Sequence, residues 1–215
     1  LQMLNAGYDD ALAYLRPGLT LCNARGVHDA STAELAVGLA IASRRSFPEF
    51  MREQIAGRWS HHRTSALSDS KIGIIGYGSI GKKIAKNLSG FEVSITAFTQ
   101  SGRDGSLTID QLDSHLPNLD IVILILPLSD SSRHLFNAER LSKMKDGALL
   151  INVARGPVVD TDALVKELNS GRIFAALDVT DPEPLPSGHP LWSAKNVQIV
   201  PHIGGNSEAF EPRGR

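Results

Sequence analysis

The sequence has a single cysteine, Cys22, among its 215 residues. A disulfide within the chain is therefore excluded, which fits a reducing compartment, and we expect a cytoplasmic protein. Long hydrophobic runs are also missing, since the strongest, IVILIL at 121–126, is too short to cross a bilayer and ends at Pro127. The formal net charge is only −1, so nothing favours nucleic acid or a membrane as a partner.

Several further patterns are absent from the sequence. The N-terminal stretch LQMLNAGYDD has no basic region followed by an apolar core, so no signal peptide is expected. The chain lacks an initiator Met and begins in the middle of a pattern, so we expect it to be part of a longer protein. The seven histidines show no convincing metal-ligand spacing, and no metal site is expected. A G-x-S-x-G nucleophile elbow is also absent.

From Lys71 onward, apolar strand patterns alternate with amphipathic helix patterns. Strands are expected at 71–76, 92–98, 120–126, 147–153, 173–179 and 196–200. Helices are expected at 79–88, 106–116 and 137–145, and at 160–171 with Asp160 as cap and Gly171 as stop. This alternation predicts an α/β fold, a doubly wound parallel sheet of the Rossmann type.

The N-terminal third is less regular. Residues 1–27 mix short apolar clusters with glycines, and their structure is not predicted. Ser31 and Glu34 have the spacing of a capping box, so a helix is expected from Ser31 to about Arg45. This helix is apolar on most sides, which is typical of a helix buried between two units. Residues 46–70 are polar and are expected to form an irregular connecting arm.

A G-x-G-x-x-G pattern at Gly76, Gly78 and Gly81 follows the first strand and opens a helix. That context is the one a dinucleotide-binding loop requires. The first glycine would permit the tight turn, the second would let a pyrophosphate approach, and the third would let the helix pack close to the strand. Backbone N–H groups at Ser79 and Ile80 would then hold the phosphates. The alternative is a glycine-rich turn without a ligand.

The second strand ends near Thr99, where NAD-binding sites commonly carry an acid for the ribose. Here TQSGRD follows, with Arg103 two residues after Ser101. Without a carboxylate, a 2′-phosphate is not repelled, and an arginine can pair with it. We therefore favour NADP over NAD. The alternative is that Arg103 is solvated and that Asp104 turns inward to the ribose.

Three chemically active side chains follow later strands of the predicted sheet: Arg155 in INVARGPVVD, Glu183 in ALDVTDPEPLP and His202 in VPHIGG. Because the carboxyl ends of parallel strands share one edge, these residues are expected to converge beside the cofactor. Arg155 would bind a substrate carboxylate and polarise its carbonyl. His202 would supply or remove a proton, and Glu183 would hold the imidazole in its charged form. Each residue alone has a structural alternative as a solvated loop residue or a satisfied histidine.

Together these motifs resemble the D-isomer-specific 2-hydroxyacid dehydrogenases. The resemblance rests on GIIGYGSIGKKIA, LPLSDSSRHLFN, LINVARGPVVDTDAL, AALDVTDPEPLPSGHPLW and VPHIGG, in the family's order, and covers roughly residues 20 to 205. It implies that Arg155, Glu183 and His202 are catalytic and that Asp178 contacts the nicotinamide carboxamide. It further implies that the backbone lines the cofactor at Leu126, Pro127, Val153 and Ala154.

The resemblance also implies a domain layout. Residues 1–27 would be a remnant of a flavodoxin-like substrate domain, with Gly7 as a candidate substrate contact. Residues 28–205 would form the dinucleotide-binding domain, and 206–215 would begin the return to the substrate domain. The family's glycine-bearing substrate loop and closing helix are not found in the sequence. The helix beginning at Ser31 would build the family's homodimer.

The expected reaction is reduction of a 2-keto acid, such as glyoxylate or hydroxypyruvate, to the D-2-hydroxy acid. The alternatives are a dinucleotide-binding sensor and an inactive fragment of this fold. Retention of Arg155, Glu183 and His202 argues against the sensor, because a sensor needs the glycine loop but no proton donor.

Overall fold

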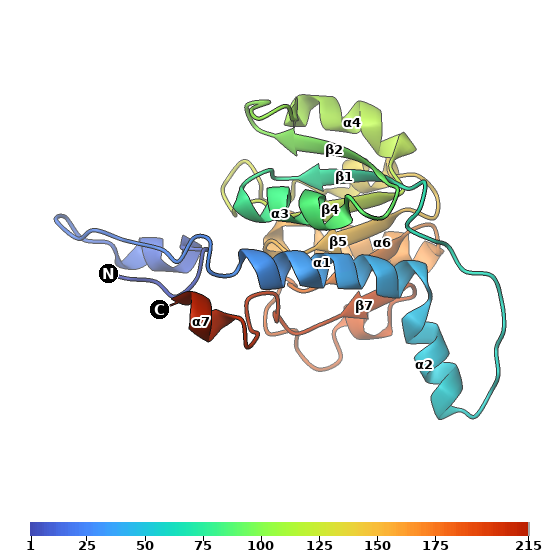
Figure 1. The fold of residues 1–215 in the computed structure, drawn as a ribbon. Helices are drawn as coiled ribbons and strands as arrows, with labels where there is room; N and C mark the ends of the chain where they lie inside the picture. Colours follow the sequence, from blue (N-terminus) through green and yellow to red (C-terminus); the bar gives the residue numbers. More distant parts are fainter. Residues whose placement is uncertain (215) are drawn as a thin grey trace.

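The computed structural model describes residues 1–214, and its centre is a parallel sheet of seven strands with helices on both faces (Figure 1). The strand order is β3-β2-β1-β4-β5-β6-β7. The predicted doubly wound α/β fold is confirmed. The strands are β1 Lys71–Ile75, β2 Ser94–Thr99, β3 Leu107–Thr108, β4 Ile121–Leu124, β5 Leu149–Asn152, β6 Phe174–Leu177 and β7 Val197–Ile199.

The helices lie before, between and after these strands. They are α1 Asp29–Arg44, α2 Phe47–Ile55, α3 Ser79–Leu88, α4 Leu112–His115, α5 Ala138–Ser142, α6 Thr161–Ser170 and α7 Phe210–Gly214. Short 3-10 turns add η1 Asp9–Tyr14, η2 Ile109–Gln111, η3 Leu116–Asn118, η4 Gly156–Val158 and η5 Pro190–Ser193. Within residues 1–214, none of the helices combines the length and the apolar character needed to cross a bilayer.

The central strands are apolar on both sides because each face of the sheet is covered. In β4, Ile121 and Ile123 belong to the cluster under α1 and α3, whereas Val122 and Leu124 belong to the cluster under α4, α5 and α6. All four side chains are fully buried. Full burial of a side chain of this size contributes about 1.5–3 kcal/mol, so β4 anchors both layers of the domain.

The order of the strands reverses at the centre of the sheet, between β1 and β4. From β1 the chain runs outward to β2 and β3, and then returns to β4 on the other side of β1. Ligands of open parallel sheets bind at such a switch point, outside the carboxyl ends of the strands. The arrows of β1 and β2 point toward the side where the N-terminal segment lies (Figure 1).

Two predictions near the N-terminus are wrong. The capping box at Ser31 does not form: α1 begins at Asp29, and the Ser31 hydroxyl donates 3.1 Å to the His28 carbonyl inside the first turn. The arm at 46–70 is not irregular throughout, because α2 occupies Phe47–Ile55. Ser46 adopts a left-handed conformation (φ 53°) that separates α2 from α1, and Pro48 fits the first turn of α2.

The helix predicted at 106–116 is broken into β3, η2 and α4. Leu107 and Thr108 pair with Phe98 and Thr99, so this stretch extends the sheet. A capping box does occur here, between Thr108 and Gln111. The remaining predicted helices are confirmed, including the Asp160 cap and the Gly171 stop of α6.

Residues 1–27 lie to one side of the sheet, next to α7 (Figure 1). Gln2 and Cys22 form an isolated parallel bridge, and the ring of His28 stacks on that of Phe210 with centroids 5.1 Å apart. The return segment predicted at 206–215 contains a short helix, α7, that was not predicted. Residue 215 of that segment lies outside the described residues.

Candidate active site

The glycine turn joins β1 tightly to α3. Gly76 has φ of 101°, and a Cβ there would lie 2.1 Å from the Ile125 carbonyl oxygen. A Cβ at Gly81 would lie 2.2 Å from the Gly76 carbonyl oxygen. At Gly78, in contrast, a Cβ would meet nothing within 4 Å. Two glycines thus permit close backbone packing, and the third faces open space that a ligand can enter.

The first turn of α3 has no side-chain cap, because the residue at the N-cap position is Gly78. The first turn also contains no Asp or Glu. The Ser79 hydroxyl donates 3.2 Å to Asp29 at the start of α1, and Ile80 packs against the apolar cluster under α1. An uncapped helix N-terminus presents free N–H groups and a positive dipole end, which suits an anion such as phosphate.

At the end of β2, the two neighbouring polar side chains have partners. The hydroxyls of Thr99 and Ser106 lie 2.8 Å apart and are buried. Asp104 forms an ion pair with Lys82 at 2.9 Å, and the hydrogen bond from Lys82 lowers the pKa of the Asp104 carboxyl. Arg103 is exposed. The cation nearest the Asp104 carboxylate is therefore supplied by α3, next to the glycine turn.

The segments expected to line the cofactor follow β4 and β5. Val153 and Ala154 are buried, Leu126 is partly buried, and the Pro127 carbonyl accepts a 2.8 Å hydrogen bond from Ser132. Leu126 and Pro127 follow β4, which adjoins β1 at the switch point, and Val153 and Ala154 follow the next strand, β5.

Asn152, which was not predicted as a site residue, holds the turn that presents Arg155. Its side chain is buried and accepts from Ala154 N (3.0 Å) while donating to the Arg155 carbonyl (3.0 Å). The signal in the sequence is a polar residue that ends a fully apolar strand.

Arg155 contacts the N-terminal segment. Its Nε lies 3.2 Å and 3.3 Å from the two carboxylate oxygens of Asp9, and its Nη1 donates 2.8 Å to the Ala154 carbonyl. A Cβ at Gly7 would lie 1.5 Å from Nη2. Gly7 thus lies directly against the guanidinium, and Asp9 was not predicted as a site residue.

His202 and Glu183 are bonded to each other: His202 Nδ1 lies 2.5 Å from Glu183 Oε1. Both side chains are partly exposed, at 46% and 38%, so the pair is open to a ligand. His202 has φ of 52°, and its backbone N–H donates 2.8 Å to the Asp178 carbonyl. This hydrogen bond to Asp178, at the end of β6, therefore fixes the position of the His202 backbone.

The loops that carry Arg155 and Glu183 pack directly on each other. A Cβ at Gly156 would lie 1.9 Å from the Thr180 carbonyl oxygen. The Thr180 N–H in turn donates 3.4 Å to Glu183 Oε2. One set of contacting loops thus runs from Arg155 through Thr180 to Glu183 and His202.

Asp178 is nearly fully buried, with 3% of its surface exposed. Burial raises the pKa of its carboxyl, and the hydrogen bonds from Ile203 N (2.7 Å) and Gly204 N (3.0 Å) act in the opposite direction. A Cβ at Gly204 would lie 2.8 Å from Asp178 Oδ2. Gly204 is therefore required for the loop after His202 to wrap around this carboxylate.

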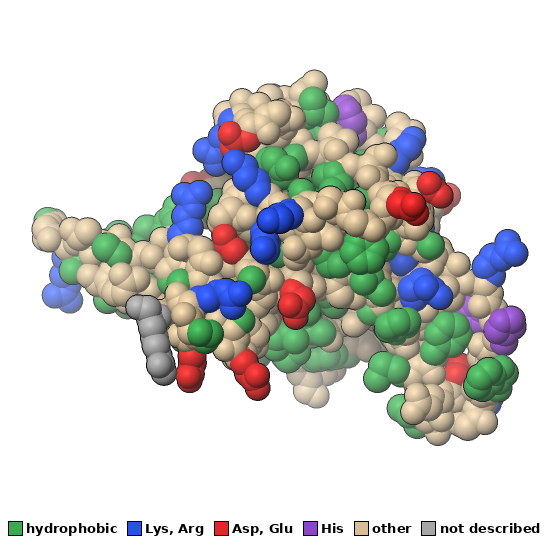
Figure 2. Space-filling model, viewed as in Figure 1, with side chains coloured by type: hydrophobic (Ala, Val, Ile, Leu, Met, Phe, Trp, Pro, Cys, Tyr) green, Lys and Arg blue, Asp and Glu red, His purple; other side chains and the backbone are tan. Residues whose placement is uncertain are grey.

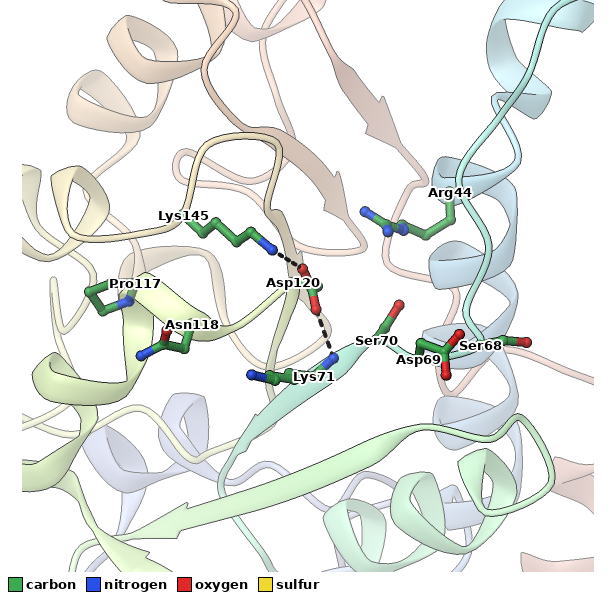
Figure 3. Close-up of a pocket in the computed structure, with 9 residues that line it drawn as sticks. All are labelled: Arg44, Ser68, Asp69, Ser70, Lys71, Pro117, Asn118, Asp120 and Lys145. Carbon is green, nitrogen blue, oxygen red and sulfur yellow. Dashed lines mark hydrogen bonds and ion pairs between the residues drawn. The ribbon is translucent and has the colours of Figure 1, made fainter.

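A cavity of about 360 Å³ lies at the opposite, amino edge of the sheet (Figure 3). Its polar groups already bond to one another, because Asp120 accepts from Lys145 Nζ (2.6 Å) and Lys71 N (2.8 Å). Arg44 Nε donates to the Ala66 carbonyl. These contacts tie the strand starts together, so the cavity is a structural feature and the carboxyl edge is the better candidate site.

Among residues 1–214, no group of three or more His, Cys, Asp or Glu side chains could hold a metal ion. The chemistry at the carboxyl edge comes from an arginine, a histidine bonded to a glutamate, and an uncapped helix N-terminus. This set suits proton transfer beside a bound anion.

Comparison with known proteins gives a family match over residues 37–204, to the model described as "D-isomer specific 2-hydroxyacid dehydrogenase, NAD binding domain". The chain is 40% identical to a glyoxylate reductase of Thermofilum pendens, covering 98% of this chain and 66% of that protein. The chain thus spans about two thirds of the length of the curated relatives it matches.

Two solved structures are similar over nearly the whole chain. A D-isomer-specific 2-hydroxyacid dehydrogenase from Xanthobacter autotrophicus, in complex with NADPH and MES, has a TM-score of 0.84 and 33% identity, covering 97% of this chain and 69% of that one. An NAD-dependent formate dehydrogenase from Staphylococcus aureus, in complex with NAD, has a TM-score of 0.88 and 28% identity, covering 99% and 67%.

Proposed function

The chain belongs to the D-isomer-specific 2-hydroxyacid dehydrogenase family, and on that premise we propose that the whole protein reduces a small 2-keto acid to its D-2-hydroxy acid. Glyoxylate and hydroxypyruvate are the substrates we favour. The observation that carries this proposal is the His202–Glu183 pair, joined through Thr180 to the loop of Arg155. We assign residues 1–27 to the substrate domain and 28–205 to the dinucleotide-binding domain.

The residues around the glycine turn fit a nicotinamide dinucleotide. Gly78 faces open space, and the first turn of α3 has no side-chain cap, so its N–H groups suit the pyrophosphate. We assign Thr99 and Arg103 to the adenosine ribose and Asp178 to the carboxamide. When bound, the reduced cofactor supplies a hydride to the substrate carbonyl carbon.

His202 is the proton donor in this proposal. Because its Nδ1 is engaged by Glu183, Nε2 is the ring nitrogen left to donate a proton to the carbonyl oxygen. Glu183 holds the ring orientation and stabilises the charged imidazolium. Arg155 binds the substrate carboxylate and polarises the carbonyl, and Gly7 lies against its guanidinium. In the oxidation direction His202 removes the same proton.

The preferred cofactor is NADP. The tip of β2 carries Thr99 instead of an acid, and Arg103 is exposed beside it. The one nearby carboxylate named above, that of Asp104, is paired with Lys82. Its charge is therefore offset and repels a 2′-phosphate less. Similar proteins include one in complex with NADPH and one in complex with NAD, so the test is KM for both reduced cofactors. A clear preference for NADH would refute this choice.

We also propose a homodimer built by α1, as the family resemblance implies, together with α2 and the following arm. These two segments continue from α1 and expose a group of large apolar side chains. Figure 2 shows apolar side chains gathered over α2, and α2 has no buried residue. Exposed apolar surface of this kind marks interaction sites. Sedimentation of the whole protein and of its Ile55→Glu variant tests the dimer, which the variant should weaken. The exposed residues are Phe47, Met51, Ile55 and Trp59.

The experiment that tests the function is a panel of 2-keto acids assayed with NADPH and NADH on the full-length protein. Oxidation of the cofactor that depends on the keto acid supports the proposal. Binding of cofactor, seen by its fluorescence, without oxidation by any keto acid would indicate a sensor instead. Absence of both binding and oxidation would indicate an inactive fold.

A further inference from the structure

The guanidinium of Arg155 is held by a carboxylate 146 residues earlier in the sequence. Asp9 approaches Nε with both oxygens, at 3.2 Å and 3.3 Å. The two side chains are 23% and 27% exposed. The pair is therefore shielded from water more than an ordinary surface ion pair and has more effect on the geometry of the arginine.

The hydrogen bonds of the Arg155 guanidinium leave three of its N–H donors without an acceptor among residues 1–214. An arginine has five N–H donors. Nε donates to Asp9, and one Nη1 donor bonds to the Ala154 carbonyl at 2.8 Å. Within residues 1–214, no hydrogen bond joins Nη2 to another residue. Two donors on Nη2 and one on Nη1 thus remain, which is the end of the fork that matches a carboxylate.

The N-terminal segment can lie this close to the Arg155 guanidinium because residue 7 is a glycine. A Cβ at Gly7 would lie 1.5 Å from Nη2, 2.7 Å from Cζ and 3.3 Å from Asp9 Oδ1. The segment therefore contacts the guanidinium through Gly7 and accepts a hydrogen bond from Nε through the carboxylate of Asp9. Both contacts come from residues 1–27, and the arginine comes from the loop after β5.

We propose that Asp9 is a positioning residue: its carboxylate fixes the Arg155 guanidinium so that the Nη1–Nη2 end faces the substrate carboxylate. This inference rests on the proposed function of Arg155. Asp9 itself does not touch the substrate in this arrangement. Its negative charge offsets that of the guanidinium, so the substrate is recognised by hydrogen-bond geometry more than by net charge.

The test compares Asp9→Ala, Asp9→Asn, Arg155→Ala and the Asp9→Ala/Arg155→Ala double variant in the full-length protein. Asp9→Ala should lower kcat/KM for the keto acid by about 10- to 100-fold, the scale on which a misplacement of about 1 Å acts. Asp9→Asn should stay within about fivefold of the parent, because its amide oxygen still accepts from Nε. The Kd for NADPH, measured by fluorescence, should not change in either variant.

The double variant decides whether Asp9 acts through Arg155. If it does, kcat/KM of the double variant equals that of Arg155→Ala, whereas independent effects multiply. Asp146→Ala, at a side chain that is 85% exposed, is the matched control and should leave kcat/KM unchanged. If Asp9→Ala fails to fold, Asp9→Leu takes its place, because leucine has a similar shape and offers no acceptor to Nε.

The outcomes separate this inference from the proposed function. If Arg155→Ala is impaired while Asp9→Ala stays within twofold of the parent, or if the two losses multiply, the positioning role is overturned and the function stands. An Asp9→Asn variant as impaired as Asp9→Ala also overturns it. If Arg155→Ala itself keeps the parent kcat/KM, the proposed role of the arginine fails first.

Discussion

One added methyl group at Gly81 should weaken both the domain and its affinity for a dinucleotide. In Gly81→Ala, the new Cβ would lie 2.2 Å from the Gly76 carbonyl oxygen, whereas real Cβ atoms keep at least 3.0 Å. The neighbour is backbone, so α3 must move away from the turn by most of an ångström. Overpacking of this kind costs about 1–3 kcal/mol, and the higher helix propensity of alanine returns up to about 1 kcal/mol.

We therefore expect a net loss of about 1–2 kcal/mol in the free energy of unfolding. For a domain of this size each kcal/mol lowers Tm by about 2–4 °C. The displaced N-terminus of α3 also loses its alignment with the turn at Gly76, so the Kd for NADPH should rise by about tenfold, which corresponds to about 1.4 kcal/mol. Thermal denaturation and fluorescence titration of the full-length protein measure the two effects.

Gly90→Ala is the matched control, because a Cβ at Gly90 meets nothing within 4 Å. Both Tm and the Kd for NADPH should stay at the parent values in that variant. A Gly81→Ala protein with parent stability and parent affinity would refute the argument that contact between this glycine and the turn positions α3.

Three further predictions concern single side chains. His202→Ala should reduce kcat by at least about 100-fold, the scale of general acid catalysis, with little change in the Kd for NADPH; an unchanged kcat would exclude His202 as the proton donor. Glu183→Gln weakens the hydrogen bond that orients the His202 imidazole, so kcat should fall by less than in His202→Ala, with little change in the Kd for NADPH; an unchanged kcat would exclude a role for Glu183 in holding the ring. Burial raises the pKa of Asp120, but hydrogen bonds from Lys145 and from the Lys71 N–H bring it below the ordinary value of 3.8. A carboxyl whose pKa is lowered by folding stabilises the protein at pH values above its ordinary pKa, and this stability is lost as the pH falls through the pKa of the folded state. Asp120→Ala should therefore be about 1–3 kcal/mol less stable than the parent at pH 7. Urea unfolding should show that difference shrinking in acid below pH 3.8, and a difference constant with pH would contradict it.

The sheet and its helices were predictable where one local signal dominates. Strand β4 has an unbroken apolar run because both faces are covered, and α6 carries its cap and its stop in the sequence. The glycine turn was predictable for a similar reason. Gly81 packs against the backbone of Gly76, five residues earlier, and Gly76 packs against the backbone of Ile125, just after β4. The cytoplasmic location stays a prediction.

The contacts that were missed depend on segments far apart in the chain. Asp9 belongs to a stretch with no regular pattern, and its partner Arg155 is 146 residues away. The Ser31 capping box was a plausible local pattern, but α1 begins two residues earlier, at Asp29. Helix α2 was missed because its apolar side chains lie beside polar ones and none of them is buried. Local patterns cannot show which distant residue completes a pair.

The hydrogen bond from Thr32 to the Gly204 carbonyl (3.1 Å) joins residues 172 positions apart. A ribosome adds roughly 5–20 residues per second, so roughly 10–30 s separate the synthesis of the two partners. For most of that interval the inner face of α1 lacks the later strands β5 and β6 on which it packs. The final packing of α1 therefore has to wait until nearly the whole domain has been translated.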